Sequence, residues 1–197
     1  MTVGAVEAIA DIGSGIFLRI DDNLIAKPDL FTELTTWNGF RGGRSEAVTR
    51  EDLAALIGVK FEKDLQAPPA RTEILVDIAT SWAQRYIVQV ASLEIIRASV
   101  NHTFQPRRIV NRAELADAAV RLIAILQERG AKFVPLVETR RIQIADVTPD
   151  NPYDASITKA VGFEIMTLTP DRKFEPERTV SGDEAIRTLD LIQKLAR

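Results

Sequence analysis

Two arginines of this sequence carry side chains suited to holding an acidic ligand. Arg50 and Arg112 each follow a small polar residue, Thr49 or Asn111, at the start of a predicted helix. A guanidinium group presents a planar fork of N–H donors that matches a carboxylate, and the unpaired amides of a helix start attract the same anions. The pattern is therefore compatible with two anion-binding sites. It is equally compatible with arginines that are solvated or paired with a neighbouring carboxylate.

Several kinds of chemistry are excluded by the residues that the chain lacks. The 197 residues include no cysteine, so disulfides, thiolate nucleophiles and cysteine-ligated metals are impossible. His102 is the only histidine, which excludes histidine-rich metal clusters and relays of several imidazoles. We therefore expect no metal site and no cofactor.

The composition is that of a globular protein without a strong charge preference. Hydrophobic residues make up 46% of the chain, which argues against disorder. The net charge of −3 gives no general attraction to nucleic acid or to anionic membranes. No apolar run approaches the roughly 20 residues that a membrane helix requires. The first residues lack the pattern of a signal peptide, so we expect an exported protein to carry this sequence as a fragment or as part of a longer chain.

Three predicted helix starts share one design. Each has a small polar N-cap residue, a valine before it and a carboxylate three positions after it; the pairs are Thr49–Asp52, Asn111–Glu114 and Ser181–Glu184. In such a capping box the two side chains bond each other's backbone amides, and the valine can pack as a hydrophobic staple. An N-cap contributes about 1 kcal/mol to stability. We therefore interpret these carboxylates as structural rather than catalytic.

The elements around these caps recur along the chain. An apolar-x-Asp-apolar segment, a helix, a Phe-x-Pro loop and a capped helix follow one another in two stretches, which begin near Asp77 and Asp146. Apolar side chains repeat with helical spacing over residues 81–98, 112–127 and 182–196. A lone pair of such helices cannot cover both buried faces, so we expect the units to pack together.

The first unit fits this plan less well. Residues 48–65 carry its capped helix, but no Phe-x-Pro loop precedes them. We expect a short β-hairpin over 15–26 and a short helix over 28–37. The DIGSG segment at 11–15 resembles the first phosphate-binding loop of actin-like ATPases. Because no other nucleotide-binding motif is present, nucleotide binding is a remote alternative.

Taken in order, these motifs resemble the S-layer homology (SLH) family. The likeness rests on the Asp77 segment, on SWAQRYI with Trp82, on TFQP and on VNRAELA, which is similar to the family's Thr-Arg-Ala-Glu signature. VTREDLA at 48–54 resembles a second copy. KFEPERTVSGDEAI at 173–186 resembles a third, in which Gly182 replaces the signature arginine. The amino-acid sequences of these motifs are similar to those of divergent SLH regions from Gram-negative bacteria.

The resemblance implies a mainly α-helical fold and a binding function. SLH modules are helix–loop–helix units, commonly three, that close into a pseudo-threefold spindle. We accordingly expect a divergent first unit at 1–66, a second at 73–129 and a third at 142–197, which together form one composite domain. Such modules attach proteins to the cell envelope by binding anionic polysaccharide, so the expected location is extracytoplasmic, in the periplasm or at the cell surface.

The resemblance also implies where a ligand binds. The expected contacts are Arg112, Arg50, Trp82, Asp77 and Arg108. An indole can stack on a sugar ring, although Trp82 equally suits a core position. Asp77 can instead bond backbone amides at the start of the following helix. Gly182 leaves at most two arginine sites. The alternative partner is an envelope protein, docked by a degenerate SLH scaffold that no longer binds glycan.

Overall fold

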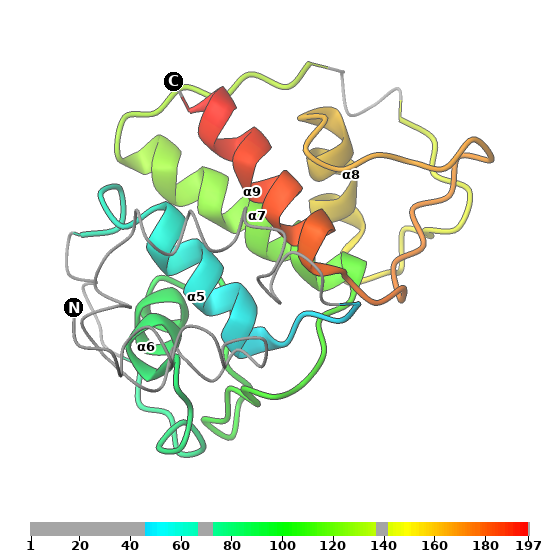
Figure 1. The fold of residues 1–197 in the computed structure, drawn as a ribbon. Helices are drawn as coiled ribbons and strands as arrows, with labels where there is room; N and C mark the ends of the chain where they lie inside the picture. The colour runs from blue at the N-terminus through cyan, green and yellow to red at the C-terminus, as the bar shows by residue number, and fades with distance from the viewer. Residues whose placement is uncertain (1–45, 67–72, 137–141, 197) are drawn as a thin grey trace, which may run out of the picture.

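The structure, a computed structural model, describes residues 46–66, 73–136 and 142–196, and these residues form a mainly helical fold (Figure 1). The helices of the described ranges are α5 (Arg50–Lys60), α6 (Gln84–Ser92), α7 (Arg112–Glu128), α8 (Asp154–Gly162) and α9 (Gly182–Leu195). The mainly α fold class is confirmed. The segments predicted as a hairpin and a helix within 15–37, and the DIGSG segment, lie outside the described residues.

Capping side chains fix the starts of the long helices. At Thr49 and Asn111 both bonds of the capping box form, because each side chain accepts from the N3 amide while the N3 carboxylate accepts from the cap amide. Ser181 forms only the first bond, with its Oγ accepting from Glu184 N at 3.2 Å. The Glu184 carboxylate accepts bonds from Arg112 and Arg178 instead. The same sequence pattern thus gives two complete capping boxes, and at Ser181 an N-cap that forms only one of the two bonds.

Helix α6 is shorter than the apolar pattern over 81–98 predicts. It ends at Ser92, and Glu94 then adopts a left-handed backbone with φ of 54°. The turn directs Ile95 and Ile96 into the core, where they are 0% and 6% exposed. The apolar pattern therefore continues past the end of the helix because the following turn is also buried.

The repeat is visible in the backbone as well as in the sequence. Left-handed residues occur at matching places of two units, in the pairs Glu94/Glu164, His102/Arg172 and Gln105/Glu175. Asp77 accepts hydrogen bonds from the amides of Phe104 at 2.8 Å and Gln105 at 2.7 Å. Asp146 does the same for the corresponding loop of its unit, with two bonds of 2.7 Å. These carboxylates thus hold the Phe-x-Pro loops, and not the start of the following helix as we expected.

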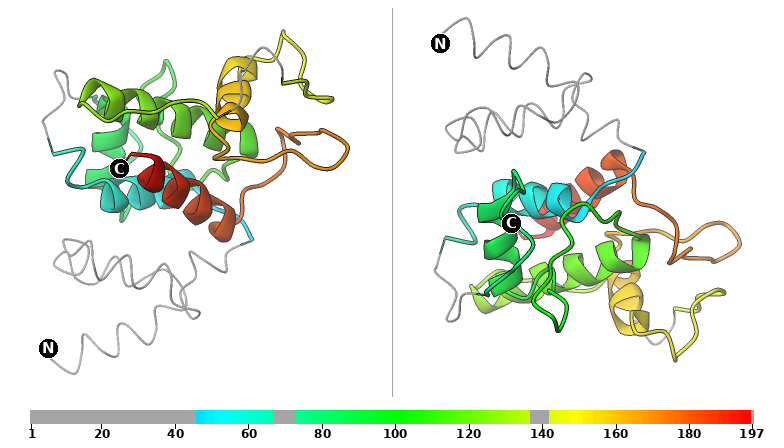
Figure 2. Two further views of the ribbon diagram at one scale, coloured as in Figure 1. Left: turned by 90° about the horizontal axis from the view of Figure 1, so that it is seen from above. Right: turned by 90° about the horizontal axis from the view of Figure 1, so that it is seen from below.

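The first helix of a unit packs against the second helix of the unit before it. Helix α6 contacts α5, and α8 contacts α7 (Figure 1). Helices α7 and α9 run alongside each other, and α9 also contacts α5 (Figure 2). An ion pair of 2.7 Å between Lys60 Nζ and Asp190 Oδ1 supports the α5–α9 contact. The two helices that belong to one sequence repeat are therefore not the two helices that pack most closely on each other.

The valines that precede the three caps form a closed ring of backbone hydrogen bonds. Val48 N donates to Val180 O at 2.9 Å, Val180 N donates to Val110 O at 3.1 Å, and Val110 N donates to Val48 O at 2.9 Å. All three valines are buried. Because each one donates to one neighbour and accepts from the other, the ring surrounds a pseudo-threefold axis.

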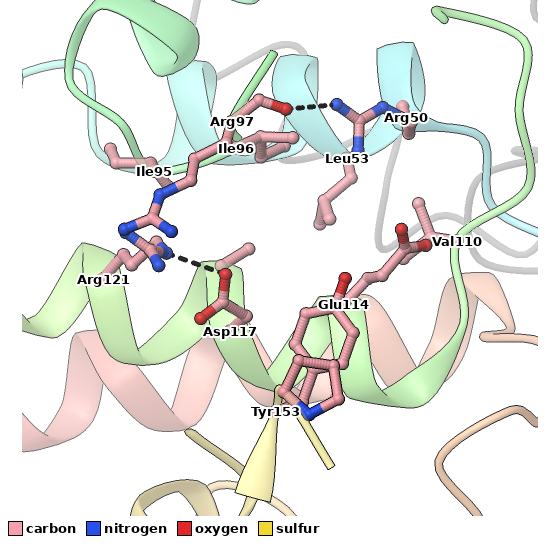
Figure 3. Close-up of a pocket in the computed structure, with 12 residues that line it drawn as sticks. Arg50, Leu53, Ile95, Ile96, Arg97, Val110, Glu114, Asp117, Arg121 and Tyr153 are labelled. Carbon is pink, nitrogen blue, oxygen red and sulfur yellow. Dashed lines mark hydrogen bonds and ion pairs between the residues drawn. The ribbon is translucent and has the colours of Figure 1, made fainter. Parts of the chain in front are cut away.

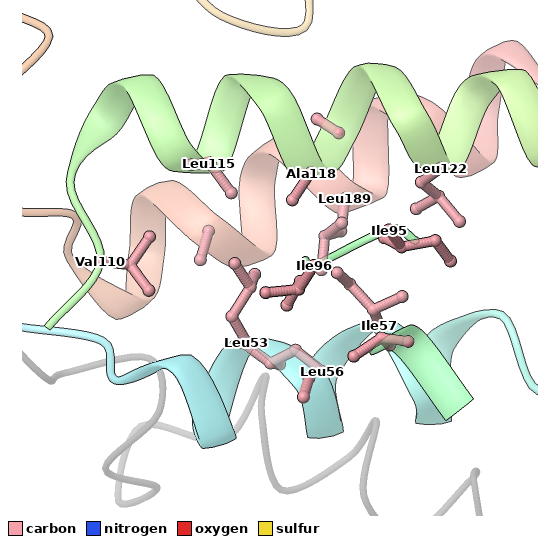
Figure 4. Packing of buried hydrophobic residues seen from close by; sticks show 14 of the residues in the cluster. Leu53, Leu56, Ile57, Ile95, Ile96, Val110, Leu115, Ala118, Leu122 and Leu189 are labelled. Atoms are coloured by element: carbon pink, nitrogen blue, oxygen red, sulfur yellow. The ribbon is translucent and has the colours of Figure 1, made fainter. Parts of the chain in front are cut away.

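The core lies between the three capped helices (Figure 4). The labelled contributors from α5, α7, α9 and the turn after α6 include Leu53, Ile57, Ile95, Leu115, Leu122 and Leu189, each at most 2% exposed. Burying such a side chain contributes about 1.5–3 kcal/mol. No described helix has both the length and the apolar character needed to cross a membrane.

Candidate functional site

A groove opens beside the start of α5, between α5, α7, the turn after α6 and the start of α8 (Figure 3). Its volume is about 250 Å³. The charged and aromatic side chains that line it are Arg50, Arg97, Glu114, Asp117, Arg121 and Tyr153. Side chains of three sequence units therefore meet at one place.

Arg50 is the innermost cation of the groove. Only 8% of the residue is exposed. Its Nε donates to Phe104 O at 2.6 Å, its Nη2 donates to Arg97 O at 2.7 Å, and its guanidinium carbon lies 4.6 Å from the centre of the Phe104 ring. Burial lowers the pKa of Arg50, and the nearby Arg108 lowers it further. The Nη1 group has no hydrogen-bond partner among the described residues and can serve a ligand.

The backbone amides at the start of α5 are already occupied. Arg50 N donates to Arg108 O and Glu51 N donates to Pro106 O, both at 2.9 Å. The start of α7 is closed in the same way by the carbonyls of Arg178 and Pro176. Each Phe-x-Pro loop thus caps the second helix of the preceding unit. The expectation that free amides assist anion binding at these two helix starts is wrong, because the loop carbonyls take them.

Both carboxylates of the groove have partners. Arg121 Nε bonds Asp117 Oδ2 at 2.7 Å, and Ser156 Oγ donates to Asp117 Oδ1 at 2.7 Å. Glu114 forms an ion pair with Arg108. The negative charges of the groove are therefore neutralised by arginines.

The remaining cations give the groove an excess of positive charge. Arg50 has no carboxylate partner within ion-pair distance in the described part of the chain, and Arg97 has only a distant one, with 3.9 Å between its Nε and Glu94 Oε2. The Arg97 side chain is 60% exposed. Tyr153 stands on the far side of the groove from Arg50 (Figure 3). Burial raises the pKa of the Tyr153 phenol, and the carboxylates of Glu114 and Asp117 raise it further.

Arg112 occupies the corresponding position on α7 but is more fully engaged. Its guanidinium lies 4.6 Å from the Phe174 ring centre. Nη1 bonds Glu184 Oε1 at 2.5 Å, and Nη2 donates to Thr167 O at 2.9 Å. Burial lowers the pKa of Arg112, and the charge of Glu184 opposes that shift. Its Nε is buried without a partner among the described residues.

The other residues singled out in the sequence lie outside the groove. Trp82 is partly buried and packs against the core. Asp77 holds the Phe-x-Pro loop, and Arg108 is an exposed partner of Glu114. Arg97 and Tyr153 could not be singled out from sequence, because turns in the folded chain bring them to the groove. The remaining pair, Asp117 and Arg121, has the spacing of an i,i+4 ion pair, which is a signal readable in sequence.

The described residues include no group of three or more His, Cys, Asp or Glu side chains arranged to hold a metal ion. In comparisons with known families, the S-layer homology domain matches residues 76–116 and 143–186. These matches run from each loop-holding aspartate to the start of the following capped helix. No curated protein matches the chain.

Proposed function

This chain is a member of the S-layer homology domain family, and on that premise we propose that it binds an acidic envelope polysaccharide in the groove beside Arg50. SLH domains are non-catalytic binding domains that attach proteins to the cell envelope. The observation that carries the finer proposal is the excess of positive charge in the groove. Arg50 and Arg97 have no close carboxylate partner in the described part of the chain, whereas both groove carboxylates are neutralised.

The Arg50 guanidinium is preorganised for binding a sugar carboxylate. Two carbonyl bonds and the Phe104 ring fix its guanidinium, so little side-chain entropy is lost when its free Nη1 donors meet a carboxylate of the sugar. Arg97 and Arg121 lie side by side in the same groove and add two further cations for the sugar carboxylate (Figure 3). The Tyr153 ring can pack on the apolar side of a sugar ring. Arg112 has fewer donors to offer because Glu184 and Thr167 already occupy its two terminal nitrogens.

Retention on purified acidic envelope polysaccharide tests this proposal. We expect the wild-type protein to be retained at low salt and released as salt rises, because exposed charges are screened. The double variant Arg97→Gln/Arg121→Gln should bind about tenfold more weakly or worse, since a hydrogen bond between charged groups contributes about 1.5–3 kcal/mol. The variant leaves Arg50 and the core unchanged.

The matched control is Arg187→Gln, which removes the same charge from an exposed position on α9 that does not line the groove. This variant should be retained like the wild type. The proposal is wrong if no acidic envelope fraction retains the protein, or if the groove and control variants behave alike.

A protein partner is the second candidate, and one observation favours it. In the second unit the apolar side chains of Ile74, Val76 and Val100 are 76%, 69% and 103% exposed. Their segments are joined by a bond from Val76 N to His102 O of 3.0 Å. The third unit has Gln143, Ala145 and Pro170 at the matching positions. Co-purification from native envelopes that is lost in Val76→Ser/Val100→Ser, with polysaccharide retention unchanged, would support this candidate.

A further inference from the structure

A second pocket lies at the start of α5 and shares no lining residue with the groove. Its volume is about 350 Å³, near the lower end of the range for small-molecule sites. It is lined by Glu51, by Asp77, Thr80 and Ser81, and by the Phe-x-Pro loop from Gln105 to Arg108. The size suits a single ring better than an extended chain.

Glu51 is the unusual feature of this pocket. It is a carboxylate that is only 7% exposed, and its Oε2 accepts a hydrogen bond of 2.5 Å from Ser81 Oγ. Among the described residues, its Oε1 has no hydrogen-bond partner and no cation lies within ion-pair distance. A buried charge without a partner is costly, so an uncompensated carboxylate facing a pocket favours a cationic ligand.

The corresponding position on α7 shows that the fold does not need this charge. There the residue is Ala113, which is fully buried. Both residues are the second of their helix, and both amides bond the carbonyl of a Phe-x-Pro proline. The second residue of α9 is Asp183, which is exposed, so among the three capped helices only α5 buries a carboxylate at this position.

The remaining lining supplies hydroxyl groups and peripheral donors. Thr80 is exposed, and Ser81 already bonds Glu51 through its hydroxyl group. Asp77 adds negative charge, but each of its oxygens is occupied by a loop amide. Arg107 is exposed and has no ion pair in the described part of the chain, so its guanidinium can donate to a ligand hydroxyl. Arg108, which also lines the pocket, is paired with Glu114. The lining thus combines one free anionic acceptor on Glu51 with hydroxyl and guanidinium groups that can bond ligand hydroxyls.

We propose that this pocket binds a sugar that carries a free amino group, with the ammonium on Glu51 and ring hydroxyls on Ser81, Thr80 and Arg107. The ammonium supplies the counter-charge that Glu51 lacks, and a single ring matches the volume of the pocket. This inference does not rest on polysaccharide binding in the groove, because the two sites share no lining residue.

Titration with three related sugars, followed by NMR of the labelled full chain, tests the proposal. Glucosamine should bind about tenfold more tightly than glucose, since its charged amino group pairs with Glu51. N-acetylglucosamine should bind like glucose because acetylation removes the charge. Shifts should appear at the amides of Ser81 and Gln105, and not at Arg97 or Tyr153.

Two substitutions make the test specific. Glu51→Gln keeps the shape and an acceptor for Ser81, and Glu51→Ala copies the residue found on α7; both should reduce the affinity for glucosamine to that for glucose. Circular dichroism checks that each variant folds. Arg97→Gln, which alters only the groove, should leave glucosamine binding unchanged. Absence of glucosamine binding, equal binding of glucosamine and glucose, or full binding by Glu51→Gln would each overturn the proposal.

Discussion

Arg112 joins the second and third units through a buried ion pair. Its side chain is 9% exposed and bonds Glu184, itself 19% exposed, while Nη2 reaches the carbonyl of Thr167. The same carboxylate would otherwise complete the capping box of α9. One residue therefore links the start of α7, the turn after α8 and the start of α9, which makes it sensitive to truncation.

We predict that Arg112→Ala destabilises the protein by about 2 kcal/mol, because it removes the buried ion pair with Glu184 and the bond to Thr167 O, although Arg178 still pairs with Glu184. Urea unfolding measures the change. Arg108→Ala is the matched control, since it breaks an ion pair whose arginine is 43% exposed and should cost less than about 1 kcal/mol. Equal losses for the two variants would contradict the structural role of Arg112. Loss of polysaccharide retention in Arg112→Ala is therefore interpretable only alongside its stability.

At the scale of elements, the contact between α5 and α6 depends on one glycine. Gly58 lies in the last turns of α5, where the Tyr86 ring of α6 approaches its backbone. A Cβ at this position would lie 2.3 Å from Tyr86 Cδ1, closer than two carbon atoms can approach. The glycine thus lets a helix from one unit pack closely on a helix from the next.

We predict that Gly58→Ala destabilises the protein by about 1–3 kcal/mol through overpacking. Helix propensity alone predicts the opposite sign, a gain of about 0.8–1 kcal/mol for alanine over glycine. The sign of the change in thermal or urea unfolding therefore decides between close packing and local propensity. In a Tyr86→Leu background the same substitution should cost less, and a stabilising Gly58→Ala in the wild type would rule out this contact.

At the scale of the whole molecule, the ring of Val48, Val110 and Val180 joins all three units by backbone bonds alone. Each bond connects residues that are at least 62 positions apart in sequence (110 − 48 = 62). These bonds join backbone atoms only, so the ring depends on how the three units are arranged relative to one another. Opening one bond requires the other units to shift.

We predict that these three valine amides exchange with solvent deuterium at similar, slow rates, which correspond to global unfolding. Native-state hydrogen exchange followed by NMR measures them. The amide of Gly130, in an exposed turn at the end of α7, should exchange much faster by local opening. If one valine exchanges by local fluctuation while the others do not, the units do not unfold together.

What the sequence determined about this protein is local. The helix starts at Arg50, Arg112 and Gly182, the repeated Phe-x-Pro loops and the SLH family could all be read from it, because caps, turns and periodicity depend on residues within a few positions of one another. The unit boundaries at 1–66, 73–129 and 142–197 stay predictions.

Only the tertiary structure decided which helices pair and which side chains share a groove. The sequence groups α6 with α7, whereas α6 packs on α5, and Gln193 of α9 donates to the carbonyl of Lys60 on α5 from 133 positions away. The capping pattern at Glu184 could not reveal that Arg112 takes its carboxylate, nor could a helix-start arginine reveal that carbonyls fix it. Such choices depend on the competition among partners distant in sequence, and that competition is settled only when the units close around a common axis.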